Sequence, residues 1–252
     1  MKDSKAPGLC PSKSVAGYVH SVDTGGMVDG PGIRYVLFLS GCSLRCKYCH
    51  NPDTWKVKSG QSVTVEDVIK DIKKYRSYLK FSGGGVTITG GEPFVQPEFL
   101  VSLLAACKEE GLHTVLDTSG HGNKAAAEAA LKYTDLLLLD IKTINAKVYK
   151  DLTGGSLERT LEVIRLSEKM AIPTWVRFVL VPGYTDNLDD IKKLADFLRP
   201  FKNVEKVEVL PFHKMGEYKW GDMNIPYELA DVQPPSLDLL EKAKAILIDE
   251  HK

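Results

Sequence analysis

The sequence predicts an α/β domain built on parallel strands, and three observations carry this prediction. The 252 residues are 43% hydrophobic and 26% charged, which is typical of a globular domain with a large core. Short, nearly continuous apolar runs alternate with amphipathic stretches, and such runs suit strands that are covered on both faces. Six strand-then-helix units follow one another, which is the pattern of a parallel βα array.

The expected strands are apolar runs rich in Val, Leu, Ile and Phe. The six are Arg34–Ser40, Val86–Thr89, Thr114–Asp117, Leu136–Asp140, Thr174–Leu180 and Val204–Leu210. An earlier segment, Ala16–Val22, is expected to add an edge strand.

Helices are expected between the strands. Thr64–Lys80 opens with Thr64 followed three residues later by Asp67, a pattern close to a capping box. Gln96–Glu110 is followed by Gly111, the residue favoured just beyond the last turn of a helix. The remaining helices are expected at Asn123–Lys132, Ser156–Met170, Asp189–Leu198 and Ser236–Glu250.

A single domain is expected over residues 1–252, because no linker or low-complexity segment divides the chain. Residues 1–15 are expected to be an N-terminal extension, and residues 211–252 a loop and helix that close one end. The polar and aromatic stretch Pro211–Pro235 is the expected loop. Six βα units are fewer than the eight of a closed barrel. The residue pattern therefore leaves two architectures, an open doubly wound sheet and an incomplete barrel.

Composition excludes several classes of protein. The 33 basic and 33 acidic residues cancel, so the overall charge gives no support for nucleic-acid or membrane-surface binding. No apolar run reaches about 18 residues, and the first residues lack the apolar core of a signal peptide. A cytoplasmic location is therefore expected.

Polar residues follow most of the expected strands. Because the carboxyl ends of parallel strands meet at one edge, these residues are expected to form one site. In chain order they are Gly41 with the cysteines after it, Gly90-Gly91-Glu92, Asp117-Thr118-Ser119, Asp140-Ile141-Lys142, Arg177, and Pro211-Phe212-His213.

Three of the five cysteines, Cys42, Cys46 and Cys49, lie within eight residues in a C-x3-C-x2-C spacing. Three thiolates on one short loop can hold an iron–sulfur cluster or a zinc ion. A structural zinc site needs a fourth protein ligand, and His50 directly follows Cys49, which is poor geometry for chelating the same ion. Cys107 lies in an apolar helical stretch, where it is expected to act as a small hydrophobic side chain. A cubane cluster with three protein ligands and one open iron is therefore favoured over closed zinc.

With this loop and four further motifs, the sequence resembles the pyruvate formate-lyase activating enzymes, a family of radical S-adenosylmethionine (SAM) enzymes. The resemblance spans about Gly17 to His251. The motifs are Asp29-Gly-Pro-Gly-Ile-Arg34, Cys42 to Trp55, Gly83-Gly-Gly85, Gly90-Gly-Glu92 and Asp140-Ile-Lys142. The fold that this resemblance implies is a partial (β/α)6 TIM-like barrel of radical SAM type.

The resemblance implies a chemistry for the cysteine loop. Cys42, Cys46 and Cys49 would hold a [4Fe–4S] cluster, and SAM would chelate its fourth iron. Reductive cleavage of SAM would give a 5′-deoxyadenosyl radical, which abstracts hydrogen from a glycine of pyruvate formate-lyase under anaerobic conditions. A flavodoxin or ferredoxin is implied as the electron donor, and a monomer is expected. The residues implied in binding SAM are Tyr48, Cys49, His50, Gly90, Gly91, Glu92, Asp140, Ile141, Lys142 and His213.

Asp117 and Asp140 follow adjacent strands, and two carboxylates converging with no basic partner between them would repel each other. A bound cation would relieve that repulsion. The resemblance implies a monovalent cation, Na⁺ or K⁺, with Thr118 and the backbone at Leu138 as further ligands. Asp117 and Thr118 could instead cap a helix.

Two residues are candidates for contact with the protein substrate. Asp29 lies between the glycine pairs Gly25-Gly26 and Gly30-Pro-Gly32, and it resembles the family's contact to the substrate glycine loop. The alternative for Asp29 is an ordinary turn. Arg177 lies on the fifth strand, where an inward guanidinium needs an anionic or carbonyl partner, which the substrate peptide or SAM would supply.

Three other functions compete with this one. Activators of other glycyl-radical enzymes usually carry an inserted segment with further cysteine runs, and this sequence has none. A radical SAM enzyme for a small molecule would have a smaller, closed site. A non-catalytic zinc module that docks on a partner would bind zinc and show no redox change.

Overall fold

The computed structural model describes residues 9–249, and its centre is one eight-stranded sheet. The six strands expected from the sequence are all present and parallel to one another. They are β2 (Arg34–Leu39), β4 (Gly85–Gly90), β5 (His113–Thr118), β6 (Leu136–Asp140), β7 (Thr174–Leu180) and β8 (Val204–Pro211).

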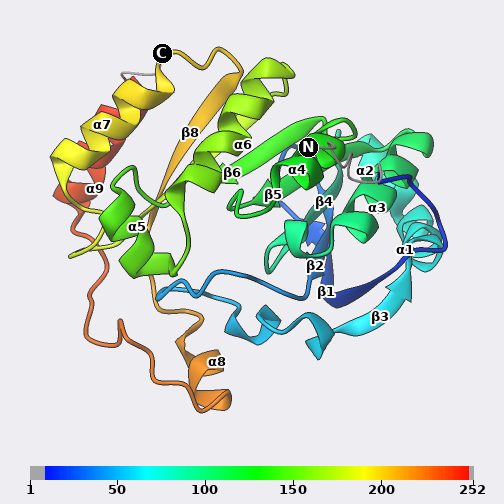
Figure 1. The fold of residues 1–252 in the computed structure, drawn as a ribbon, viewed down its shortest axis with the longest axis horizontal. Coiled ribbons are helices and arrows are strands. Elements are labelled where there is room, and N and C mark those ends of the chain that lie inside the picture. Colours follow the sequence, from blue (N-terminus) through cyan, green and yellow to red (C-terminus); the bar gives the residue numbers. More distant parts are fainter. Residues whose placement is uncertain (1–8, 250–252) are drawn as a thin grey trace, which may run out of the picture.

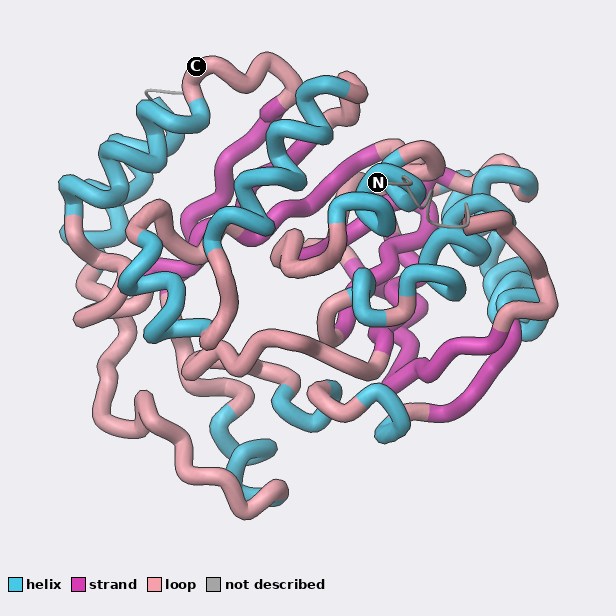
Figure 2. The backbone as a smooth tube through the Cα atoms, viewed as in Figure 1, coloured by secondary structure: helices cyan, strands magenta, loops and turns pink. Residues whose placement is uncertain are grey.

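The order of the strands decides between the two architectures. From β2 to β8 the parallel strands lie side by side in chain order, each new strand added at the same edge. A doubly wound sheet reverses its order at a switch point, and this sheet does not. The strands curve into an incomplete ring with most helices outside it (Figures 1 and 2). The sheet is not closed, and the predicted partial barrel is confirmed.

Two antiparallel strands extend the sheet beyond β2. The segment expected at Ala16–Val22 continues to Gly26 as β1 (Ala16–Gly26), which pairs antiparallel with β2. This segment was predicted to be the edge strand. That prediction is wrong, because β3 (Gln61–Thr64) pairs with the other side of β1 and forms the edge. β3 was not predicted, because its four residues are exposed or half-buried and form no apolar run.

Each predicted helix is found, with altered bounds. The segment predicted as one helix, Thr64–Lys80, is divided by a 3-10 turn at Lys73–Tyr75. The capping box between Thr64 and Asp67 is present. The last helix changes to a π-helical turn at Ala245–Asp249, and Glu250 lies outside the described residues. The helices with predicted counterparts are α1 (Val65–Ile72), α2 (Arg76–Phe81), α3 (Pro97–Glu109), α4 (Lys124–Leu131), α6 (Leu157–Lys169), α7 (Leu188–Leu198) and α9 (Leu237–Lys244).

Two α-helices of the described chain were not predicted. α5 (Ala146–Thr153) follows β6, capped by the Asn145 side chain and ended by Gly154 in a left-handed conformation. α8 (Glu217–Asp222) interrupts the stretch Pro211–Pro235, which was predicted to be a loop throughout. Short helices of this length carry little periodic signal.

The main hydrophobic core joins the sheet to the helices on its outer side. A second, smaller cluster lies at the carboxyl ends of the strands. Its buried members come from the cysteine loop, α5 and the chain after β7 and β8, and are Tyr48, Leu152, Val181, Phe212 and Leu229. This cluster packs the cysteine loop against the C-terminal half of the sheet.

The single domain expected over residues 1–252, with an N-terminal extension and a C-terminal loop and helix, stays a prediction. One continuous sheet spans β1 to β8. Residues 1–8 of the expected N-terminal extension lie outside the described residues. No helix of the described chain is long and apolar enough to cross a membrane.

Candidate active site

A cavity of about 380 Å³ opens at the carboxyl ends of the parallel strands. All six strands contribute to its walls, directly or through the residues that follow them, as the sequence analysis expected. The expected site residues that line it are Asp29, Cys42, Cys46, Tyr48, Cys49, His50, Gly90, Gly91, Asp117, Thr118, Asp140, Lys142, Arg177 and His213. Glu92, Leu138 and Ile141 do not line it.

Backbone hydrogen bonds hold the cysteine loop in place on two sides. On one side the Gly41 and Cys42 amides donate to the carbonyls of Thr54 and Trp55, at 2.6 and 3.1 Å. On the other side the Arg45 amide donates to the Thr153 carbonyl at 2.8 Å, at the end of α5. These bonds tie the loop to residues 54 and 55 and to the end of α5.

The three thiols lie around one cavity without meeting at a point. Burial raises the pKa of both Cys42 and Cys46 to about 12, and it also raises the pKa of Cys49. Among residues 9–249, no three His, Cys, Asp or Glu side chains gather closely enough to share a single metal ion. The donor set itself, three thiols of one loop at one cavity, is of the kind that an iron–sulfur cluster uses.

The glycine pair after β4 allows two loops to approach closely. Gly90 has φ +117°, and a Cβ there would lie 2.2 Å from the backbone nitrogen of Leu39. A Cβ on Gly91 would lie 2.1 Å from the Gly41 carbonyl oxygen. The glycines therefore let β4 continue directly beneath the start of the cysteine loop.

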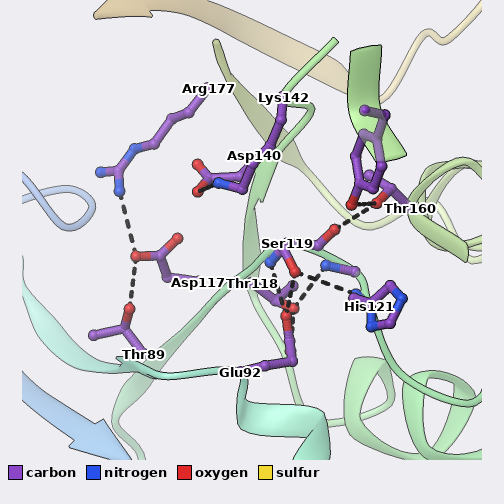
Figure 3. Close-up of polar contacts among 12 residues, drawn as sticks. Thr89, Glu92, Asp117, Thr118, Ser119, His121, Asp140, Lys142, Thr160 and Arg177 are labelled. Atoms are coloured by element: carbon purple, nitrogen blue, oxygen red, sulfur yellow. Dashed lines mark hydrogen bonds and ion pairs between the residues drawn. The ribbon is translucent and has the colours of Figure 1, made fainter. Parts of the chain in front are cut away.

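Glu92 has a different environment from the one expected. The family resemblance implies Glu92 in binding SAM. In the structure the side chain is 1% exposed, and its oxygens accept hydrogen bonds from Thr118 Oγ1 at 2.6 Å and from Ser119 Oγ at 2.6 Å. The Ser119 amide also donates to it at 3.0 Å (Figure 3), and the Phe94 amide donates at 3.2 Å. Its carboxylate thus fixes the loop after β5.

The premise for a cation between Asp117 and Asp140 is wrong, because both carboxylates have basic partners. Arg177 Nη1 lies 3.4 Å from Asp117 Oδ2, and Lys142 Nζ lies 2.8 Å from Asp140 Oδ2 (Figure 3). Topology brings Arg177 in, since it pairs in register with Asp140 on β6, and β5, which carries Asp117, is the next strand. Lys142 lies only two residues from Asp140 in the chain. Sequence spacing alone does not show the contact between Asp117 and Arg177, which lie 60 residues apart.

The environment shifts the pKa of one group in each pair, with opposite effects on its charge. Burial raises the pKa of Asp117 to about 6, although Arg177 opposes that shift. Burial disfavours the charge on Lys142, but the Asp140 carboxylate outweighs it and the Lys142 pKa is raised well above its ordinary value. Lys142 is therefore a fixed cation in the cavity wall.

Arg177 joins three parts of the fold. Besides Asp117, its Nε lies 3.2 Å from Glu208 Oε2 on β8, and its Nη2 donates to the Val28 carbonyl. Asp29, the next residue after Val28, lines the cavity, and burial raises its pKa. The guanidinium thus positions the loop that carries Asp29.

Aromatic and imidazole rings form the wall on the side of β8. The His50 and His213 rings stack with centroids 4.3 Å apart, and burial lowers the pKa of His50. Lys142 Nζ lies 5.4 Å from the centroid of the Tyr48 ring. Among residues 9–249, the Tyr48 hydroxyl and His213 Nδ1 are buried without a hydrogen-bond partner. These two atoms are free to bind a polar ligand in the cavity.

Sequence reasoning missed the residues that support the loop from α8. Trp220 Nε1 donates to the Cys49 carbonyl at 2.9 Å, and Lys219 Nζ contacts Asn51 Oδ1 at 2.9 Å and Asp53 Oδ2 at 3.1 Å. Asn51 and Asp53 lie within four residues of Cys49, so the sequence shows that they are close to the cysteines. Trp220 lies 171 residues from Cys49, and no sequence signal connects them.

Comparison with known proteins assigns this arrangement to a class. Residues 36–198 match the family model described as the Radical SAM superfamily. A radical SAM methyltransferase from Sphaerobacter thermophilus superimposes with a TM-score of 0.62 at 16% identity, over 86% of this chain and 64% of that one, which shows the shared fold.

Closer relatives define the family. The pyruvate formate-lyase 1-activating enzyme of Escherichia coli K12 is 44% identical over 236 residues, 93% of this chain and 96% of that protein. The pyruvate formate-lyase-activating enzyme of Staphylococcus aureus USA300 is 48% identical, over 90% of this chain and 93% of that protein. A solved domain of such an enzyme from Bacteroides vulgatus is 28% identical with a TM-score of 0.56, covering 66% of this chain and 94% of that one. The chain belongs to the radical SAM superfamily and, within it, to the pyruvate formate-lyase-activating enzymes.

Proposed function

We propose that the chain activates pyruvate formate-lyase by radical chemistry. In this proposal Cys42, Cys46 and Cys49 hold a [4Fe–4S] cluster, and SAM is reductively cleaved beside it. The resulting 5′-deoxyadenosyl radical removes hydrogen from a glycine of the target. The observation that carries the proposal is the single cavity that joins the three cysteines to the other polar residues at the strand ends. Family membership and the names of the relatives support the choice of target.

The chain's own residues would bind and orient the ligands. The bound cluster would supply one electron to the sulfonium of SAM. Lys142 presents a fixed positive charge to a carboxylate, and the unpartnered Tyr48 hydroxyl and His213 Nδ1 offer hydrogen bonds to polar groups. The stacked rings of His50 and His213 give a flat wall against which an adenine can pack. Asp29 lies at the same cavity, where a glycine loop could meet it.

The monovalent cation stays a prediction. At Asp117, Thr118, Asp140 and the backbone of Leu138 it would compete with the ion pairs to Arg177 and Lys142. Ligand binding would first have to open one of these pairs. A flavodoxin or ferredoxin as electron donor, a monomeric state and a cytoplasmic location also remain predictions.

An anaerobic assay tests the proposed function. Protein reconstituted with iron and sulfide is mixed with reductant, SAM and pyruvate formate-lyase, and the glycyl radical is read by electron paramagnetic resonance. A glycine-centred doublet is expected. Formation of 5′-deoxyadenosine without the doublet would keep the radical chemistry and reject this target. Neither signal from loaded protein would contradict the proposal and favour the zinc module.

Two cysteine variants provide the matched control. Cys42→Ala removes a side chain of the cavity and is expected to abolish both signals. Cys10→Ala removes an exposed thiol outside the cavity and is expected to leave both unchanged.

A further inference from the structure

His121 contacts the cysteine loop but does not line the cavity. Its backbone is anchored to the buried Glu92, because its amide donates to Ser119 Oγ at 3.4 Å and Ser119 Oγ donates to Glu92 at 2.6 Å (Figure 3). From this anchor the imidazole reaches two other parts of the chain. Its Nδ1 lies 2.8 Å from Ser43 Oγ, and its Nε2 lies 3.3 Å from the Ser156 amide nitrogen. One side chain thus joins the loop after β5, the cysteine loop and the connection between α5 and α6.

The hydrogen-bond partners define the state of the imidazole. A backbone amide can only donate, so Nε2 accepts from Ser156 and the neutral ring carries its proton on Nδ1. Nδ1 therefore donates to Ser43 Oγ, and that hydroxyl in turn donates to the His121 carbonyl at 3.4 Å. Burial, followed by the charges of Arg159 and Lys150, lowers the pKa of His121 below its ordinary 6.5, which favours this neutral form.

The residue after Ser43 connects this contact to a thiol. Burial raises the pKa of Cys42, and the Leu44 amide opposes that shift by hydrogen-bonding to the Cys42 sulfur. The Leu44 side chain is 1% exposed and packs on Gly155 beside the imidazole. A Cβ on Gly155 would lie 2.3 Å from Leu44 Cδ2 and 3.0 Å from His121 Nε2. Residues 43 and 44 are therefore held by His121 and by the glycine on which it packs.

An amide hydrogen bond to a ligand sulfur changes the properties of an iron–sulfur cluster. The positive end of the N–H dipole stabilises the added electron of the reduced cluster and so raises its reduction potential. The bond to Cys42 requires that the Leu44 amide keep its direction. Ser43 lies between these two residues, and its hydroxyl is held by His121.

We propose that His121 is a positioning residue that keeps the Leu44 amide directed at the Cys42 sulfur. This inference rests on the proposed function, which places a [4Fe–4S] cluster on Cys42. His121 acts through Ser43 and lies outside the cavity in which the ligands would bind. Its removal should therefore change the reduction potential and the retention of the cluster.

Four single variants and one double variant provide the test. His121→Phe keeps a ring and removes both hydrogen bonds of the imidazole, whereas His121→Asn keeps an amide nitrogen in the place of Nδ1 and can still donate to Ser43. Ser43→Ala removes the other partner of that bond at an exposed side chain, so it folds even if His121→Phe does not. Ser156→Ala is the matched control, because within the described chain its hydroxyl caps no amide of α6 and its own amide is retained. The double variant combines His121→Phe with Ser43→Ala.

Each protein is loaded with iron and sulfide under anaerobic conditions. The midpoint potential is measured by redox titration, and iron release is measured by transfer to a chelator. His121→Phe and Ser43→Ala are each expected to lower the potential and to release iron at least about threefold faster, a smaller effect than the roughly 10–100-fold loss of metal affinity for groups that bond a ligand directly. The double variant should match either single variant, because both remove the same contact. His121→Asn and Ser156→Ala should stay near the wild type.

Several outcomes would overturn the positioning role of His121. They are an unchanged potential in His121→Phe or Ser43→Ala, an equal fall of the potential in Ser156→Ala, additive effects in the double variant, and no recovery in His121→Asn. Failure of the wild type to bind iron and sulfide would instead count against the proposed function.

Discussion

At the scale of single residues, the site depends on backbone atoms as much as on reactive side chains. Gly91 contributes no functional group, yet the Gly41 carbonyl occupies the place where its side chain would be. The Gly91 and Glu92 amides continue this contact by donating to the Leu39 and Gly41 carbonyls, both at 2.8 Å. The cysteine loop therefore begins on a surface that only glycine can form.

Gly91→Ala is expected to destabilise the fold by about 1–3 kcal/mol, because the new methyl group overlaps a backbone oxygen that cannot move alone. Urea denaturation of the iron-free protein measures the change. Gly221→Ala is the control, since a Cβ at that position meets nothing within 4 Å. Equal stability of the two variants would contradict this account.

A second residue-scale contact lies at the start of the strands, away from the cavity. Arg34 is fully buried, and its Nη1 lies 3.2 Å from His113 Nδ1. Arginine can only donate, so His113 Nδ1 accepts and the imidazole is neutral. Burial, followed by the charge of Arg34, lowers the pKa of His113 below its ordinary 6.5.

Stability should therefore depend on pH through His113. Its folded pKa lies below the unfolded one, so the unfolded chain binds the proton first and stability falls as pH drops through 6.5. His113→Gln removes this titration. We expect the stability advantage of the wild type over the variant to shrink between pH 7.5 and pH 5.5, measured by urea unfolding. Other titrating groups, such as Asp117, cancel in that difference. Parallel curves for the two proteins would disprove the assignment.

At the scale of elements, the six residues of α8 support the cysteine loop. Trp220 is 4% exposed, stacks edge-on against Trp55 with centroids 5.1 Å apart, and hydrogen-bonds the Cys49 carbonyl. Lys219 holds Asn51 and Asp53 on the far side of the cysteines. A short helix in a long connection thus acts as a brace for the loop.

Trp220→Phe is expected to weaken the hold on a cluster, because it leaves the Cys49 carbonyl without its donor while keeping a large ring. A lost bond of this kind costs about 1–3 kcal/mol. Iron and sulfide retained after gel filtration, and the charge-transfer absorbance, provide the measurement. Tyr218→Phe in the same helix changes a side chain that is 65% exposed and should retain the wild-type content. Similar losses in both variants would show that α8 has no specific role.

At the scale of the whole molecule, the sheet gathers residues from across the chain. Because consecutive parallel strands are adjacent, six successive carboxyl ends surround one cavity, from Cys42 to His213. β1 and β3 extend the sheet beyond β2, at the edge opposite β8. A ligand bound in this cavity would contact nearly every strand.

Cluster loading should therefore stabilise the whole fold. A ligand that binds only the folded state at 100 times its dissociation constant adds about 2.7 kcal/mol. We expect loaded protein to unfold at higher urea concentration than iron-free protein under anaerobic conditions. The difference should persist in Cys10→Ala and vanish in Cys42→Ala. A difference that survives in Cys42→Ala would mean that the metal binds elsewhere.

The sequence by itself determined the parallel strands, the cysteine spacing and the strand-end positions that line the cavity. These features are local, since apolar runs and the interval C-x3-C-x2-C are properties of neighbouring residues. It also indicated the family, because those motifs occur together in one order.

Only the tertiary structure decided the partners of these residues. It paired Asp117 with Arg177, turned Glu92 toward Ser119, and placed Trp220 against Cys49. It also chose the singly wound barrel over the doubly wound sheet. The physical reason is the same in each case. A contact between residues far apart in the chain depends on the order and curvature of the strands, and the residue pattern does not specify either.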